Sequence, residues 1–119
     1  MDALGGVTRQ DLEHHFAAAF ESRTGKLPAA TTIVECGDLL IIRADGTLTR
    51  KQGVLGGRDP GLMSELSRSV LDELAHQDLW EVAEAEAGRP VTAVLADQSV
   101  DPDVAIVCFV LGESASDPA

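Results

Sequence analysis

Two stretches decide the fold, because they repeat one pattern: residues 25–43 (GKLPAATTIVECGDLLIIR) and residues 88–111 (GRPVTAVLADQSVDPDVAIVCFVL). In each stretch a glycine, a basic residue and a proline follow a helix-like segment and precede two apolar runs. Glycine, proline and aspartate between the runs favour tight turns. The four expected strands are residues 30–36, 39–43, 91–97 and 104–111. The repeat therefore predicts two helix–hairpin units that share one core.

The expected helices carry start signals and apolar stripes. Thr8 is a good N-cap with Asp11 three residues later, and a glycine at position 25 ends that helix. Asp59 and Pro60 open a second helix, which weakens around residues 76–78, where Asp78 and Glu81 favour a restart. The expected buried stripes are Leu12, Phe16, Ala19 and Phe20 in the first helix and Met63, Leu66, Val70 and Leu74 in the second.

These elements predict an α+β fold in the order α-β-β-α-α-β-β. The two hairpins form a four-stranded antiparallel sheet with helices packed on one face. A chain of 119 residues is expected to form one domain. We place that domain at residues 8–112, between a flexible N-terminus (1–7) and a disordered tail (113–119).

The formal net charge of -11 argues against binding to nucleic acid or to anionic membrane surfaces. Aromatic residues make up 3% of the chain, so a stacking platform for bases is not expected. Cys36 and Cys108 lie in apolar strand patterns and are interpreted as small core residues in a reducing compartment, although a bridge stays open. The longest apolar run has eight residues (104–111) and no signal peptide is recognised, so a cytoplasmic protein without membrane insertion is expected.

Two of the expected strands are apolar on both faces. Residues 39–42 and 104–111 present aliphatic side chains at odd and even positions alike. Helices on one face of the sheet would leave the other face uncovered. A second copy of the chain is the simplest cover, so we expect a homodimer.

The segment 43–58 is the candidate ligand site. It holds four of the nine basic residues of an otherwise acidic chain, together with glycines that could free backbone N–H groups for an anion. The candidate ligand-binding residues are Arg43, Thr49, Arg50, Lys51, Gly56, Gly57 and Arg58. The alternative interpretation is a mobile, solvated loop whose charges offset the acidic surface.

No catalytic, metal or cofactor signature is recognised. His14 and His15 are adjacent and point about 100° apart on a helix, so they do not chelate as an i, i+4 pair does. The acidic run at Asp101–Asp103 lacks the glycine and distal glutamate of a calcium loop and is interpreted as a turn. We therefore expect no cofactor, no metal and no enzyme activity.

A family resemblance adds to this interpretation. The run Gly37-Asp38-Leu39-Leu40-Ile41-Ile42-Arg43, followed by Gly46-Thr47-Leu48-Thr49 and Gly57-Arg58, resembles the MpsC-like family of small bacterial proteins. The resemblance covers residues 8–111 and continues through an interrupted helix, Gly88, Asp97 and the apolar last strand. The chain departs from the family between residues 50 and 57, where members carry a helix-forming stretch rich in glutamate and lysine.

The resemblance implies an accessory protein of a membrane system for ion or inorganic-carbon uptake and membrane potential, with no catalytic residues to carry over. Our leading hypothesis is a non-catalytic accessory protein that binds a membrane transport protein. The alternative is a small-anion or nucleotide sensor that uses loop 43–58. An enzyme working at a dimer cleft is the least favoured hypothesis.

Overall fold

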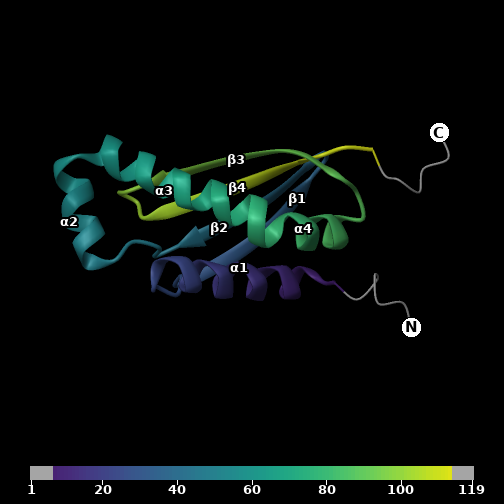
Figure 1. Cartoon of the computed structure of the whole chain (residues 1–119), viewed down its shortest axis with the longest axis horizontal. Coiled ribbons are helices and arrows are strands. Elements are labelled where there is room, and N and C mark those ends of the chain that lie inside the picture. Colours follow the sequence, from purple (N-terminus) through teal and green to yellow (C-terminus); the bar gives the residue numbers. More distant parts are fainter. Residues whose placement is uncertain (1–6, 114–119) are drawn as a thin grey trace.

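The computed structural model describes residues 7–113 and shows one antiparallel sheet with its helices on one side (Figure 1). The strands are β1 (Ala30–Cys36), β2 (Leu39–Asp45), β3 (Val91–Ser99) and β4 (Val104–Leu111). Their order in the sheet is β1-β2-β4-β3, so the two hairpins meet through β2 and β4. The predicted fold class and strand pairing are confirmed. Apart from residues 7 and 113, the predicted flexible N-terminus and disordered tail lie outside the described residues.

The helices are α1 (Arg9–Thr24), α2 (Arg50–Arg58), α3 (Pro60–Leu74) and α4 (Trp80–Ala87), with a π-helical turn η2 (Ala75–Leu79) between the last two. The start of α1 is the one that the sequence predicts. Asp11 N–H donates to Thr8 Oγ1 at 3.1 Å, and Thr8 N–H donates to Asp11 Oδ2 at 2.9 Å. Gly25 ends the helix in the left-handed region, with φ of 78°.

The core lies between the helices and the inward face of the sheet. Leu12, Phe16 and Phe20 of α1 belong to one buried cluster with the inward-facing side chains of β2 and β4. Full burial of one such side chain stabilises the fold by about 1.5–3 kcal/mol. The remaining large core residues are Ile33, Leu40, Ile42, Leu71, Leu74, Leu79, Val107, Phe109 and Leu111.

The interpretation of segment 43–58 as a loop is wrong, because residues 50–58 form α2. A reciprocal capping box starts this helix: Thr49 N–H donates to Gln52 Oε1 at 2.8 Å, and Gln52 N–H donates to Thr49 Oγ1 at 3.1 Å. Gly56 is buried where α2 packs on Val100 and Met63. Capping and packing thus outweigh the low helix propensity of three glycines.

The predicted break at residues 76–78 is a change of helix type instead. The chain passes from α3 through η2 into α4, and no side chain caps the start of α4. Asp78 is not an N-cap but accepts from Arg23 of α1, with Nε 2.6 Å from Oδ2. Arg23 also pairs with Glu73 at 2.7 Å. The wider π turn shifts the phase of the apolar stripe. Through Arg23, α1 is tied to this turn and to the end of α3.

The buried stripe of α3 also differs from the prediction. Met63 and Leu74 are buried as expected, but Leu66 is 49% exposed and Leu71 is buried in addition. Val70 is half-buried. Leu66 and Val70 line a cavity between α2 and α3 rather than the sheet-facing core. The periodicity of apolar residues predicts which side chains share one face of a helix. It does not predict whether another element packs against every part of that face.

Candidate functional site

The outward face of the sheet carries no helix among the described residues (Figure 1). The side chains on this face are largely apolar. The strand register aligns one side chain from each strand into a row across its centre: Val34, Ile41, Cys108 and Leu95. The neighbouring row consists of Cys36, Leu39, Val110 and Ala93. We call these two rows the open face. Val34 of the edge strand β1 is 46% exposed, and Leu95 of the edge strand β3 is 64% exposed. Together with their neighbours in the two rows they form a contiguous apolar surface.

The prediction that both cysteines are core residues is therefore wrong. Cys36 is exposed and Cys108 is half-buried, and both are free thiols on the open face. Alternation along a strand assigns residues to two faces, but it does not say which face the helices cover. Partial burial raises the pKa of the Cys108 thiol, because it disfavours the charged thiolate.

Charged side chains border the open face on one side. The next row contains Thr32, Arg43, Ile106 and Asp97. Arg43 pairs with Asp45 at 2.9 Å, and Asp97 lies 3.7 Å from Arg68 of α3. These pairs are well exposed and contribute little to stability. They leave a cation and an anion beside an apolar centre.

The structure does not gather the predicted ligand-binding residues into one cradle. Arg43 lies on the outward side of β2, whereas Thr49 is the N-cap of α2 and Gly56 is buried. Arg50 and Lys51 lie in the first turn of α2, and Arg58 ends it, about 12 Å away along the helix axis. Gly57 is exposed beside Arg58. The backbone N–H groups expected to face an anion serve the helix and its cap instead, and ligand binding by these residues stays a prediction.

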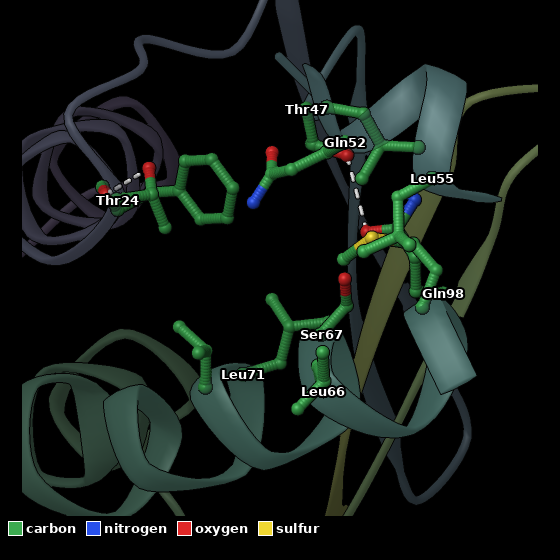
Figure 2. A pocket seen from close by; sticks show the side chains of 12 residues that line it. Thr24, Thr47, Gln52, Leu55, Leu66, Ser67, Leu71 and Gln98 are labelled. Carbon is green, nitrogen blue, oxygen red and sulfur yellow. Dashed lines mark hydrogen bonds between the residues drawn. The ribbon is translucent and has the colours of Figure 1, made fainter. Parts of the chain in front are cut away.

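A cavity of about 240 Å³ lies on the helical side of the molecule (Figure 2). Its walls come from the end of α1, the β2–α2 connection, α2, α3 and one residue of β3. The lining side chains are Phe20, Thr24, Thr47, Leu48, Gln52, Leu55, Met63, Leu66, Ser67, Val70, Leu71 and Gln98. None of them is charged. Its size is close to the lower end of the range of about 300–1,000 Å³ that is typical of small-molecule sites.

A buried polar network forms one wall of this cavity. Thr47 and Gln98 are 1% and 5% exposed, and Thr47 Oγ1 lies 3.1 Å from Gln98 Oε1. The Gln98 amide donates to the carbonyl oxygens of Ser99 at 2.6 Å and Val104 at 3.1 Å. The network satisfies these buried groups, so it fixes the wall rather than offering free polar atoms.

Sequence reasoning missed the cavity residues, although part of the signal was present. The pattern Thr49-x-x-Gln52 is a capping box, and it predicts both a helix and the position of the Gln52 amide. No comparable signal marks Gln98 or Ser67. Their roles depend on contacts between segments that are distant in the sequence.

The described residues 7–113 resemble neither of two simple types of site, a metal centre and a membrane-spanning helix. They contain no cluster of three or more histidine, cysteine, aspartate or glutamate side chains that could hold a metal ion. Within the same range, every helix is too short or too polar to cross a bilayer.

These observations define a small α+β domain with one helix-covered sheet face, one open face and an uncharged cavity under its helices. The chain belongs to the MpsC family: residues 6–113 match the family model described as Na+-translocating membrane potential-generating system (MpsC). This confirms the resemblance found in the sequence. No curated protein and no solved structure matches the chain.

Proposed function

We propose that this protein is a cytoplasmic, non-catalytic accessory component of a membrane ion-transport system, and that its working unit is a homodimer paired through the open faces. The open face is the observation that carries the proposal. The family description names a membrane-potential-generating system, which supplies the class of partner. A protein that acts by binding needs an interaction surface rather than catalytic groups. The outward side of the sheet provides such a surface, because its side chains are exposed and largely apolar.

A second copy fits the open face by both shape and charge. Two flat sheet faces can pack about 10 Å apart with their side chains interdigitated, as in a β-sandwich. In a two-fold arrangement the border residues Arg43 and Asp97 of one copy can meet their opposites in the other. Such pairing would cover the apolar rows and offset charge at their edge.

The area of the open face determines the affinity that we expect for the dimer. Four strands of seven to nine residues form a surface of about 400–500 Å² per copy. Stable interfaces bury about 800 Å² per partner, so the sheet face alone supports a concentration-dependent dimer rather than a permanent one. A dimer of moderate affinity suits a component that exchanges between its own copy and a membrane partner.

The alternative of an anion sensor has weaker support. Arg50 and Lys51 are exposed and form no ion pair with described residues, which favours contact with an acidic group. The capping box nevertheless takes the N–H groups of Thr49 and Gln52, so the start of the helix offers an anion only part of its usual donors. We therefore rank the sensor below the accessory component.

The proposed function is tested in the native host. The gene is deleted, and membrane potential is measured with a voltage-sensitive dye as external Na+ is varied. We expect the deletion to lower the Na+-dependent potential and the wild-type gene to restore it. Leu95→Glu, on the open face, should fail to restore it. Leu27→Glu should succeed, because Leu27 is a leucine of comparable exposure (55% against 64%) that lies outside the sheet. Full restoration by Leu95→Glu, or an unchanged potential in the deletion strain, would contradict the proposal.

A further inference from the structure

We infer that the cavity between α1, α2 and α3 binds a small, neutral, mostly apolar molecule that carries a hydrogen-bond acceptor such as a carbonyl oxygen. The cavity lies on the helical side of the sheet, away from the open face, so this inference does not depend on the proposed accessory role.

The lining of the cavity selects against charge. Seven of its twelve residues are apolar, and none is basic or acidic. Arg23 lies on the adjacent turn of α1, but its guanidinium is engaged by Asp78 and Glu73. An ionised ligand would lose its hydration without gaining a counter-charge, which costs far more than the transfer of a neutral molecule.

The polar groups of the cavity divide into occupied and available ones. Thr24 donates its hydroxyl to Phe20 O at 2.8 Å, and Thr47 and Gln98 belong to the buried network. Gln52 is different: the capping box holds its Oε1, and its Nε2 points into the cavity without a partner among the described residues (Figure 2). Ser67 Oγ likewise forms no hydrogen bond with a described residue. Two donors in an apolar cavity indicate an acceptor on the ligand.

The mouth of the cavity is also apolar. Leu55 of α2 is 39% exposed and Leu66 of α3 is 49% exposed, and both line the cavity. A ligand seated between them would remove this surface from water. The capping box at the start of α2 fixes Gln52 before the ligand arrives, so little side-chain ordering is required on binding.

The test titrates the full-length, isotope-labelled protein with three probes of similar length: 2-heptanone, hexanoate and hexylamine. We expect 2-heptanone to shift the NMR signals of the Met63 methyl group and the Gln52 side-chain amide, with a Kd on the order of 1 mM or tighter. The anion and the cation should bind at least about ten-fold more weakly, because the cavity offers no counter-charge. The neutral-ligand inference is overturned if either charged probe binds as tightly as the ketone, or if the ketone causes no saturable shift.

Variants locate the binding. Ser67→Leu fills the cavity and should abolish binding of 2-heptanone, whereas Ser69→Leu, on the exposed side of the same helix, should leave it unchanged. Gln52→Glu keeps the capping pattern and removes the amide donor, so it should weaken ketone binding by about three- to ten-fold. Wild-type affinity in both Ser67→Leu and Gln52→Glu would show that the ketone binds elsewhere and would overturn the assignment. Because Gln52→Glu conserves the helix cap, its result holds even if Ser67→Leu fails to fold.

Discussion

The Asp103 carboxylate accepts hydrogen bonds from both the backbone N–H and the side-chain hydroxyl of Thr47. Asp103 Oδ1 accepts from Thr47 N–H at 3.0 Å and lies 2.8 Å from Thr47 Oγ1, while Oδ2 accepts from Leu48 N–H at 3.0 Å. The two residues are 56 positions apart in the sequence. The carboxylate therefore connects the β3–β4 turn to the segment that leads from β2 into α2. It thereby fixes the position of Thr47 and Leu48, which line the cavity.

Replacement of Asp103 tests this tie. Asp103→Ala removes the three hydrogen bonds to Thr47 and Leu48, and it leaves the buried Thr47 hydroxyl without its nearest acceptor. We expect the free energy of unfolding to fall by about 2–4 kcal/mol, measured by urea denaturation. Asp101→Ala is the control, because Asp101 is exposed in the same turn, and it should change stability by less than about 0.5 kcal/mol. Equal effects of the two variants would show that the hydrogen bonds to Thr47 and Leu48 do not carry the connection.

Neighbouring glycines of α2 should respond to alanine in opposite ways. A Cβ at Gly57 meets no atom within 4 Å, so Gly57→Ala should stabilise the protein by about 0.5–1 kcal/mol through helix propensity. A Cβ at Gly56 would lie 2.7 Å from Val100 Cγ1, so Gly56→Ala must displace either that side chain or the helix. We expect Gly56→Ala to lower the melting temperature and Gly57→Ala to raise it. A gain for both would mean that α2 does not pack on Val100 as described.

Features of this fold that depend on residues close together in the sequence were predictable, whereas features that depend on contacts between distant residues were not. The start and end of α1 and the hairpin turn at Gly37 were predictable, because Thr8, Asp11 and Gly25 act on their own backbone within a few residues. The helix α2 was not predicted, since its glycines argue against it and its packing partner Val100 lies more than forty positions away.

The limits at the candidate site have the same origin. Alternation predicted which strand residues share a face, but the position of the helices decides which face is covered. Cys36 and Cys108 were therefore placed in the core when they lie on the open face. The cavity is built from five separate segments, so no single stretch of sequence marks it.

Glu86 gives the protein a predictable pH dependence. Burial, and secondarily the nearby Glu35, raises the pKa of Glu86 above its ordinary value of 4.5, and its Oε1 has no hydrogen-bond partner among the described residues. The folded state thus holds this proton more tightly than the unfolded state. Stability therefore falls as pH rises from the ordinary pKa of a glutamate through the raised pKa of Glu86, and the full penalty is present above the raised pKa.

Glu86→Gln should therefore raise the free energy of unfolding at pH 7 by about 0.5–1 kcal/mol, allowing for solvent screening. The gain should shrink at pH 4, where the wild-type carboxyl is itself protonated. Denaturation of both proteins at the two pH values measures the effect, with Glu81→Gln on the exposed side of the same helix as the control. A gain that is the same at both pH values would show that the charge of Glu86 is not its cause.

Salt should strengthen the proposed dimer. Each copy carries a net charge of -11, so two copies repel one another while their apolar faces attract. Raising the salt concentration from about 0.01 M to 0.15 M shortens the screening length from about 30 Å to about 8 Å, which weakens the repulsion. Sedimentation equilibrium should show a lower dimer dissociation constant at the higher salt. Weaker association at high salt would indicate an interface held mainly by ion pairs.

The central claim is that a second copy covers the open face, and multi-angle light scattering of the purified full-length chain tests it most directly. At about 100 µM and physiological salt, we predict a mass approaching twice the chain mass of 12.5 kDa for the wild type and for Leu27→Glu. Leu95→Glu should stay at the mass of one chain, because a carboxylate would be buried between the two sheets. A wild-type mass of one chain under these conditions, or a dimer that Leu95→Glu leaves intact, would contradict the account.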